Sequence, residues 1–335
     1  MLMLLQAILV VAAAALTSEA TTARAVSVRA AQSCSAVHVN AAIAQAADGD
    51  TVTIPACPSG TDVWGATSDT PVSVNKNITL KGAGPDSTKV LLGATTAFLI
   101  DASGATVRDF SVLTKAGTTS AKSVFFSTDG ACQYGCGLHR GLAEWRVTGM
   151  VFDQGSSYVG YIFNIGKPNN TEARTWGLVD GNKFLNMKDE QLNWRGPCDS
   201  WDTPTNFGGA AALFLENNLF AATAGSSAYL DSNSNARIVA RYNVFNSVYL
   251  DMHGMASDYD TCHPEKHEGV RSVEAYNNRF VNNTWMAVYI RGGTGLIHDN
   301  VADNPNPTAA RGGVWMQQYI LHAMRIGHTR VSERI

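Results

Sequence analysis

Charge is scarce in this chain. Lys, Arg, Asp and Glu together make up 16% of the 335 residues, and the formal net charge is −3. Domains that bind nucleic acid usually carry a basic patch or stripe, and neither such a stripe nor a base-stacking motif occurs here. We therefore expect no nucleic-acid partner. Long apolar runs are also scarce, because beyond residues 1–17 no segment is long and apolar enough to span a bilayer.

The apolar run at residues 1–17 (MLMLLQAILVVAAAALT) is itself short for a membrane span. Ser18 and Ala20 place small residues at positions −3 and −1 of a cleavage site, which is typical of a secretory signal peptide. We predict a signal peptide at residues 1–20, an N-terminal extension at 21–33, and a secreted or periplasmic protein with no membrane partner after cleavage. No Lys or Arg precedes the run, so an uncleaved N-terminal anchor is the alternative.

A short phrase recurs in the second half of the chain, in which Asn is followed by one residue and then Phe. It begins at Asn182, Asn218, Asn243 and Asn278, and a weaker copy begins at Asn300. The steps are 36, 25, 35 and 22 residues, and a unit of about 20–25 residues stretched by insertions indicates a solenoid. Alternating β-branched and aromatic residues, with Asn and Gly at the corners, favour strands. We predict a parallel β-helix in which the Asn residues stack coil on coil and the Phe rings stack inside.

The front of the chain supports this prediction. Residues 37–50 (VHVNAAIAQAADGD) have the pattern of a short amphipathic helix, a strand pattern (TVTIPA) follows at 51–56, and a second coil (ITLKGAG) follows at 78–84. On these features the chain resembles the pectate-lyase-like right-handed parallel β-helix superfamily over residues 34–305. The resemblance implies an all-β, right-handed parallel β-helix solenoid of about eight to ten coils with an N-terminal capping helix, which we expect around residues 36–47. Residues 306–335 are a tail that either folds back as a cap or reflects a truncated reading frame.

Several motifs of that superfamily are missing. The chain has neither the Gly-His-Gly nor the Asn-Thr-Asp of polygalacturonases, lacks the Trp-Ile-Asp-His of pectate lyases, and lacks the motifs of pectin methylesterases. It looks more like the generic β-helix proteins grouped near alginate and chondroitin lyases. The superfamily includes lyases, hydrolases, esterases, epimerases and adhesins, so the resemblance predicts the fold but leaves the activity open.

Six cysteines in an exported chain predict three disulfides, with free buried thiols as the alternative. Two of the cysteines lie in the longest insertions of the repeat, at 196–209 and 252–268. Loops leaving the same corner of neighbouring coils should form the two walls of a cleft, with the short coil at 231–237 as its floor. The spacing favours pairing Cys34 with Cys57, Cys132 with Cys136, and Cys198 with Cys262.

One column of the repeat carries charge. When the triplets that end in Arg195, Asp231, Asp251 and Arg291 are aligned, these four residues share one position on consecutive coils. Neighbouring strands lie about 4.8 Å apart, so we expect Asp231 and Asp251 side by side with an Arg beyond each. An exposed ladder of this kind suits acid–base chemistry or cation binding. A buried one is costly unless fully paired, and a salt-bridged ladder that only fixes the register is the alternative.

The candidate site extends to the neighbouring insertion and aromatic residues, although each loop residue could equally be solvated and each aromatic could equally be packing. Residues 231–235 (DSNSN) alternate Asp or Asn with Ser, and their side-chain oxygens suit calcium, although stacking of corner Asn residues explains the pattern equally well. The expected cofactor is therefore none or calcium. The candidate catalytic residues are Arg195, Asp231, Asp251, His253, Lys266 and Arg291. The candidate substrate contacts are Trp194, Trp201, Tyr229, Tyr249, His267, Arg271 and Tyr289. The candidate calcium ligands are Asp231, Asn233 and Asp251.

Three function classes fit these residues. The first is a polysaccharide lyase that cleaves a uronic-acid-containing polymer by β-elimination, with Arg195 or Arg291 neutralising the C6 carboxylate and His253 or Lys266 as base. The second is a glycoside hydrolase that uses a pair of Asp residues. The third is a non-catalytic glycan-binding or surface β-helix protein. We expect the first, with an acidic polysaccharide as partner and a monomeric chain.

Overall fold

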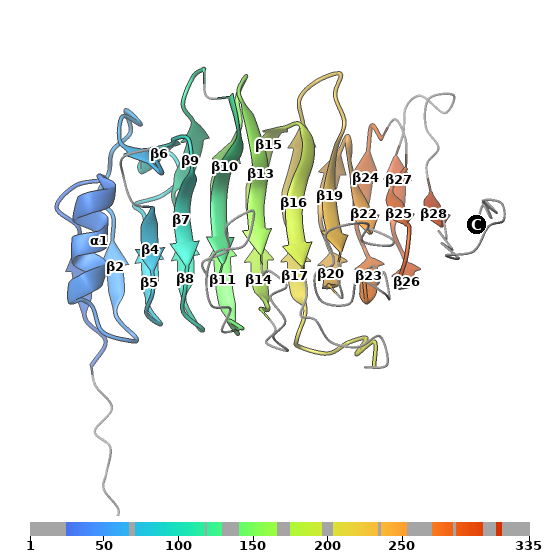
Figure 1. Ribbon diagram of the computed structural model, residues 1–335, viewed down its shortest axis with the longest axis horizontal. Coiled ribbons are helices and arrows are strands. Elements are labelled where there is room, and N and C mark those ends of the chain that lie inside the picture. The colour runs from blue at the N-terminus through green and yellow to red at the C-terminus, as the bar shows by residue number, and fades with distance from the viewer. Residues whose placement is uncertain are drawn as a thin grey trace, which may run out of the picture.

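The computed structural model describes residues 25–66, 71–117, 119–128, 141–165, 175–195, 204–233, 236–252, 270–283, 286–303 and 313–316. These residues form an all-β, right-handed parallel β-helix solenoid, as predicted. Figure 1 shows the strands side by side along the long axis, with the one described helix at the N-terminal end and β28 near the other end. In the described part of the chain, no helix is long and apolar enough to cross a membrane.

Each coil contributes one strand to each of three parallel sheets, which we call sheets I, II and III. Sheet I contains, in spatial order, β1 (Val28–Ala30), β2 (Thr51–Thr53), β5 (Thr79–Lys81), β8 (Thr106–Arg108), β11 (Trp145–Thr148), β14 (Gly177–Asp180), β17 (Leu213–Glu216), β20 (Arg237–Arg241), β23 (Ser272–Tyr276) and β26 (Thr294–His298). Sheet II contains β3 (Val63–Trp64), β6 (Lys89–Leu92), β9 (Ser111–Thr114), β12 (Val151–Asp153), β15 (Lys183–Met187), β18 (Leu219–Ala222), β21 (Val244–Asn246), β24 (Arg279–Val281) and β27 (Val301–Asp303). Sheet III contains β4 (Val72–Val74), β7 (Thr96–Ile100), β10 (Thr119–Thr128), β13 (Tyr158–Ile165), β16 (Asp189–Arg195), β19 (Ala228–Asn233), β22 (Val248–Met252), β25 (Val288–Ile290) and β28 (Val314–Met316).

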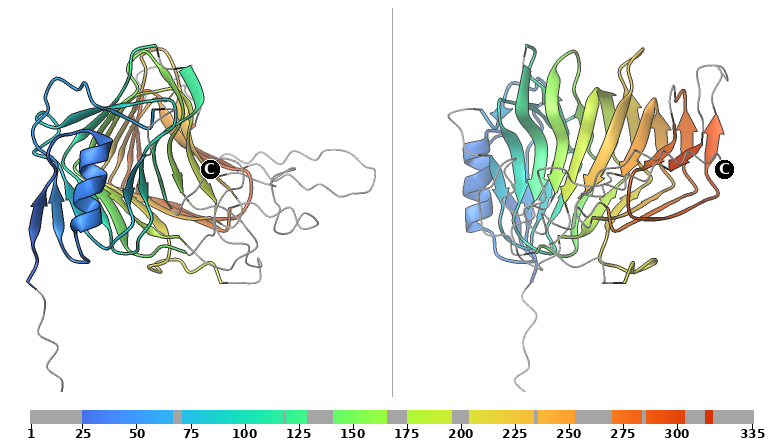
Figure 2. Two further views of the ribbon diagram at one scale, coloured as in Figure 1. Left: turned by 60° about the vertical axis from the view of Figure 1, so that its left-hand side comes forward. Right: turned by 45° about the vertical axis from the view of Figure 1, so that its right-hand side comes forward.

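Sheets II and III have nine strands each among the described residues, so the solenoid has nine described coils, within the predicted eight to ten. The coil path turns from sheet I to sheet II to sheet III, and Figure 2 shows the coils stacked along one axis. Strand pairing continues at both ends of the described solenoid, where β1 pairs with β2 and β28 pairs with β25.

The predicted Phe stack forms the centre of the core. Each Phe of the repeat lies in register with the Phe of the next coil on sheet II, and every ring is fully buried. Neighbouring rings are stacked with nearly parallel planes, and their centroids are 4.7 Å apart for Phe184 and Phe220, 5.1 Å for Phe220 and Phe245, and 4.8 Å for Phe245 and Phe280. Burial of one such ring stabilises the fold by roughly 2–3 kcal/mol.

The predicted Asn ladder forms at the corner between sheets I and II. The Nδ2 of Asn218 donates to Oδ1 of Asn243 at 3.0 Å and to the carbonyl of Val179 at 2.8 Å, and the other ladder residues repeat this pattern. These amides are buried, so each of their polar atoms needs such a partner. The residue before each ladder Asn turns the corner with a positive φ. These residues are Gly181, Asn217, Tyr242, Asn277 and Asp299.

The N-terminal end is closed by α1 (Ala36–Gln45), close to the expected 36–47. Ser35 accepts a hydrogen bond from the N–H of His38 at the start of the helix. At the helix end, the Nζ of Lys76 donates to the carbonyls of Ile43, Ala44 and Ala46. Carbonyls at a helix end lack part of their intrahelical hydrogen bonding, so a lysine from the next coil supplies further donors there.

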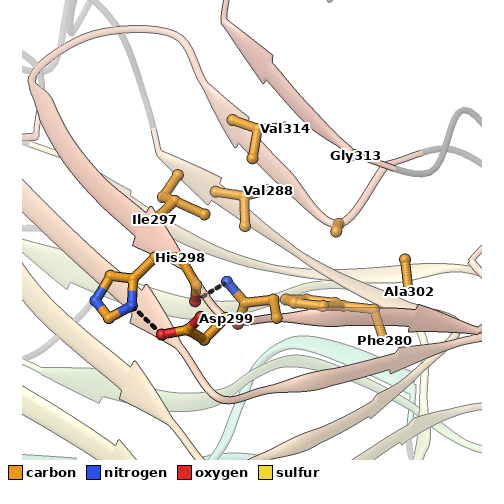
Figure 3. Close-up of a pocket in the computed structure, with 10 residues that line it drawn as sticks. Phe280, Val288, Ile297, His298, Asp299, Ala302, Gly313 and Val314 are labelled. Atoms are coloured by element: carbon orange, nitrogen blue, oxygen red, sulfur yellow. Dashed lines mark hydrogen bonds and ion pairs between the residues drawn. The ribbon is translucent and has the colours of Figure 1, made fainter. Parts of the chain in front are cut away.

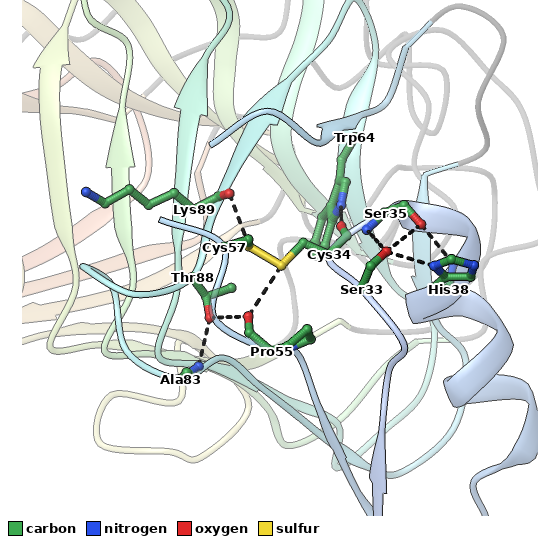
Figure 4. Close-up of a disulfide and its surroundings, with 10 residues drawn as sticks. All are labelled: Ser33, Cys34, Ser35, His38, Pro55, Cys57, Trp64, Ala83, Thr88 and Lys89. Carbon is green, nitrogen blue, oxygen red and sulfur yellow. Dashed lines mark hydrogen bonds between the residues drawn. A yellow bond between two sulfur atoms is a disulfide. The ribbon is translucent and has the colours of Figure 1, made fainter. Parts of the chain in front are cut away.

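A disulfide fastens this capped end to the solenoid. Cys34 and Cys57 are bonded, as predicted, and the bond lies beside Trp64 and Pro55 (Figure 4). The indole N–H of Trp64 donates to the carbonyl of Cys34 at 2.8 Å. The disulfides predicted for Cys132 with Cys136 and for Cys198 with Cys262 lie outside the described residues and stay predictions.

Candidate functional site

Six of the residues that were predicted to form the site lie together on the outer face of sheet III. Along β19 and β22, Leu230 and Leu250 point into the core and are fully buried. Side chains alternate along a strand, so Asp231 and Asp251 belong to the outer face. We call the outer-face set the tyrosine–aspartate patch; it comprises Tyr229, Asp231, Tyr249, Asp251, Tyr289 and Arg291.

The two carboxylates are direct neighbours, as predicted. Asp231 pairs in register with Asp251, and Tyr229 pairs with Tyr249 in the same way. Because the strands are about 4.8 Å apart, two carboxylates from consecutive coils share one small region of the face. This adjacency is the part of the predicted charged column that the structure confirms.

The two arginines of that column are not in register with the carboxylates, so the aligned column is wrong at both ends. Asp231 pairs with Asn193, and Arg195 pairs with Asn233 instead. Asp251 pairs with Tyr289, which places Arg291 two residues further along. A bulge between Glu190 and Leu192 shifts the register of β16. On the other side, Val288, the first residue of β25, pairs with Leu250, the third residue of β22, so the phrase of β25 lies two residues further along the sheet.

Arg291 nevertheless reaches both carboxylates. A shift of two residues keeps a side chain on the same face of a sheet. Its Nε donates to Oδ1 of Asp251 at 2.8 Å, and its Nη2 lies 3.8 Å from Oδ1 of Asp231. Its guanidinium carbon lies 5.4 Å from the centre of the Tyr289 ring, within the range of a cation–π contact. The structure therefore brings Asp231, Asp251 and Arg291 together by side-chain reach.

Arg291 remains a cation in this setting. Burial acts to lower the pKa of Arg291, but the charges of Asp251 and Asp231 and the hydrogen bond to Asp251 together act more strongly in the other direction. The pKa is raised above its ordinary value, so the guanidinium cannot serve as a base at neutral pH. Its chemical capability is to hold or neutralise a negative charge.

The carboxylates are buried, whereas the guanidinium is partly open. The side chains of Asp231 and Asp251 are 6% and 7% exposed, and that of Arg291 is 21% exposed. A buried carboxylate without a partner is strongly destabilising, so the ion pairs are needed for the fold as well as for any chemistry. The partly exposed guanidinium of Arg291 therefore lies against two buried carboxylates.

The tyrosines of the patch stack on one another. The rings of Tyr229 and Tyr249 are 5.3 Å apart with an angle of 23° between their planes. Tyr249 and Tyr289 are buried and pack with Met286 in a small cluster outside the main core. Tyr249 and Tyr289 are only 7% and 8% exposed, so these two rings mainly pack the patch. Met286 was not foreseen, because nothing in the repeat distinguishes it from other corner residues.

The end of the first insertion lies against sheet I. Arg237 donates to the carbonyl of Pro204 at 2.9 Å, Ser272 donates to the carbonyl of Thr205 at 3.2 Å, and the N–H of Gly208 donates to Glu274 at 2.8 Å. Ser272 follows the second insertion closely in sequence. The end of the first insertion therefore contacts the strand that follows the second insertion, while residues 253–268 of that insertion lie outside the described residues, so the predicted cleft stays a prediction. Arg271, a predicted substrate contact, is 8% exposed beside them.

The remaining predicted site residues cannot be placed in this arrangement. Trp201, His253, Lys266 and His267 lie outside the described residues. Trp194, Arg195 and Asn233 lie on β16 and β19, but their side chains are outside the described part. Asn193, the register neighbour of Asp231, was missed because the triplets were aligned by similarity and the bulge has no sequence signature.

The described side chains fit calcium poorly. Calcium takes six to eight oxygen ligands, and here the two carboxylates hold the Arg291 guanidinium between them. A cation at this point would have to displace that guanidinium. Among the described residues, the close group of three potential metal ligands is Cys34, Cys57 and Asp62, and its two sulfur atoms are joined in the disulfide.

Comparison with known proteins adds no relative to this picture. No protein-family model matches the sequence, and no curated protein matches it significantly.

Proposed function

We propose that this chain is an exported, monomeric, carbohydrate-active member of the pectate-lyase-like β-helix superfamily, and that it cleaves an acidic polysaccharide by β-elimination at the tyrosine–aspartate patch. The observation that carries the proposal is the arginine held as a cation by two carboxylates from consecutive coils. The resemblance of the first coils to that superfamily and the parallel β-helix support the family. The N-terminal apolar run and the Cys34–Cys57 disulfide support export, because disulfides persist in oxidising compartments.

The chemistry assigns a role to each group. In β-elimination a base removes the C5 proton of the uronate, the C4–C5 double bond forms, and the C4–O bond breaks as the departing oxygen takes up a proton. Neutralising the C6 carboxylate acidifies the C5 proton, and a fixed cation does so without reorganisation. Arg291 supplies this charge by exchanging its longer contact with Asp231 for the substrate carboxylate, while its hydrogen bond to Asp251 holds it in position. His253 and Lys266 are the candidate bases.

Hydrolysis is the second candidate, and the adjacency of the two carboxylates favours it. Retaining glycosidases place their two carboxyl groups about 5–5.5 Å apart, and residues paired on adjacent strands are separated by a similar distance. Asp231 and Asp251 are such a pair. In this case one would act as acid and the other as nucleophile.

A substrate screen separates these functions. The purified chain is incubated with pectin, alginate, glucuronan and glycosaminoglycans, and both ultraviolet absorbance and reducing ends are followed. A lyase raises both, because its product is unsaturated, whereas a hydrolase raises reducing ends alone. Binding without either signal identifies a glycan-binding protein and overturns the enzymatic proposal.

A matched pair of variants assigns the activity to the patch. Asp251→Asn should lower turnover by about 10²-fold or more, the scale expected when a group that organises charge at a reacting centre is lost. Asp180→Asn is the control, because Asp180 forms an ion pair with Arg146 on sheet I, away from the patch. Equal activity in the two variants would place the chemistry elsewhere.

A further inference from the structure

The corner between β4 and β5, close to α1, carries the triplet Asn77-Ile78-Thr79. In an exported protein, an Asn that is followed two residues later by Ser or Thr, with any residue except Pro between them, is an acceptor for an N-linked oligosaccharide. A sequence match of three residues is a weak signal by itself. The surroundings of the triplet in the fold therefore have to show whether a glycan can be attached and accommodated.

The fold keeps both reactive side chains of this triplet on the surface. Ile78 is buried at 2% exposure, whereas Asn77 on one side of it is exposed and Thr79 on the other side is partly exposed. Thr79 begins β5 and lies on the outer face of sheet I, because the next residue, Leu80, is fully buried in the core. The acceptor amide and the hydroxyl that marks it therefore remain accessible in the folded chain.

The backbone of Asn77 is held in place, whereas its carboxamide is uncommitted. The N–H of Asn77 donates to Oδ1 of Asp48 at 2.9 Å, and its carbonyl accepts from the N–H of Gly49 at 2.7 Å. Within the described part of the chain, the carboxamide makes no hydrogen bond. It lies over Gly104 of the next coil, where an added Cβ would come within 2.8 Å of Nδ2. Substitution of Nδ2 would therefore break no contact that holds the fold.

The position of the triplet leaves the other surfaces of the molecule free. In sheet III, β4 and β19, the first strand of the tyrosine–aspartate patch, are five strand steps apart, which is about 24 Å. The opposite end of the described solenoid has a cavity of about 230 Å³ beside Phe280, near which His298 and Asp299 form a hydrogen bond (Figure 3). A glycan next to α1 would cover neither the patch nor this cavity.

We propose that Asn77 carries an N-linked glycan in the exported protein. The donor is an oligosaccharide attached to a lipid pyrophosphate in the secretory pathway. The Nδ2 of Asn77 forms a bond to C1 of the first sugar, the bond between C1 and the pyrophosphate oxygen breaks, and the proton lost from Nδ2 balances the charge of the released lipid pyrophosphate. The inference rests on the proposed export and is independent of the proposed activity.

The inference is confined to this one triplet. Two further triplets of the same kind begin at Asn169 and Asn282. Asn169 and Thr284, the hydroxyl residue of the last triplet, lie outside the described residues. The Nδ2 of Asn282 also donates to Asn246 at 3.0 Å, so that amide is engaged.

The test expresses the full-length chain in eukaryotic cells and maps the purified protein by mass spectrometry. An N-glycosidase converts a glycosylated Asn into Asp, so the map reads residue 77 as Asp wherever a glycan was attached. Thr79→Val removes the hydroxyl but keeps a β-branched side chain on β5. Asn75→Gln, in the same exposed connection, is the matched control. We expect Asp at position 77 in the unaltered chain and in Asn75→Gln, and Asn in Thr79→Val. Asp in Thr79→Val as well would overturn the proposal.

A second chain separates the acceptor from the export on which it depends. It carries a secretion leader of the host in place of residues 1–20, so its entry into the secretory pathway does not require the native N-terminus. An unmodified Asn77 in both chains would overturn the assignment of the acceptor without touching the proposed export. Modification of the host-leader chain alone would overturn the proposed export and, with it, the modification of the native protein.

Discussion

Arg291 and Asp251 are joined by a hydrogen bond of 2.8 Å across two coils, although Arg291 lies two residues beyond the strand position that pairs with Asp251. The long arginine side chain makes up the difference. The charge arrangement of the patch is therefore a property of side-chain length as well as of strand register. Four predictions follow from the patch and from the ladder that supports it.

Arg291→Met should lower the turnover of a uronate polymer by about 10²-fold or more, because the neutralising cation is lost. Arg291→Lys should recover only part of the activity, because lysine keeps the charge but cannot make the Nε bond to Asp251. The measurement is the initial rate of absorbance increase. Arg146→Met removes an arginine from the exposed pair on sheet I and serves as the control. Full activity in Arg291→Met would remove Arg291 from the reaction.

Chelation should leave the activity within about twofold, because the guanidinium occupies the place between the two carboxylates where a calcium ion would bind. The check is the rate after dialysis against a chelator and again after calcium is added back. If activity disappears and calcium restores it, the Arg291 contacts must open in the working enzyme. Thermal unfolding followed in the same samples separates a loss of activity from a loss of fold.

Asn243→Ala should lower the free energy of unfolding by about 3–5 kcal/mol, because four buried hydrogen bonds are lost at once. Denaturant unfolding provides the measurement. The control is Asn246→Ala, which removes only an exposed contact with Asn282 and should change the stability by less than about 0.5 kcal/mol. Similar values for the two variants would mean that the ladder contributes little to stability.

Tyr242→Asn should raise the free energy of unfolding by about 0.5–1 kcal/mol, because Tyr242 has a φ of 59° and Asn tolerates this left-handed conformation better. Asn217 and Asn277 already occupy the same corner position on neighbouring coils. Tyr242→Ala removes the same ring contact with Tyr276 without the gain in backbone preference, so it should be less stable than Tyr242→Asn. An Ala variant at least as stable as the Asn variant would refute the argument.

The fold was accessible from the sequence because its main contacts repeat with the coils. Asn218, Asn243 and Asn278 each provide hydrogen bonds at the same buried corner. Phe220, Phe245 and Phe280 each fill the same layer of the core. The same residue types therefore recur in the sequence with each coil. The capping helix was equally accessible, because α1 shows its apolar face and its boundary residues locally.

The site was only partly accessible for a different physical reason. Asp231 and Asp251 each end the same Tyr-Leu-Asp phrase, and the two phrases pair residue for residue, so aligning them gave the observed pairing. Arg195 and Arg291 were misplaced because a bulge in β16 and a two-residue offset of β25 shift the register, and neither has a pattern that a single sequence displays. The burial of the carboxylates was also beyond reach, since the outer face of a solenoid strand has no fixed exposure.

The direction of the Asn ladder has a consequence for how the solenoid comes apart. Every rung donates from the earlier coil to the later one: the amide of Asn182 needs Asn218, that of Asn218 needs Asn243, and that of Asn278 needs Asn300. If a coil unfolded from the C-terminal side, the buried Asn amide on the coil before it would lose its acceptor. Fraying by single coils is thereby disfavoured, and we expect the coils from Asn182 to Asn300 to exchange their amide hydrogens together, as one cooperative unit.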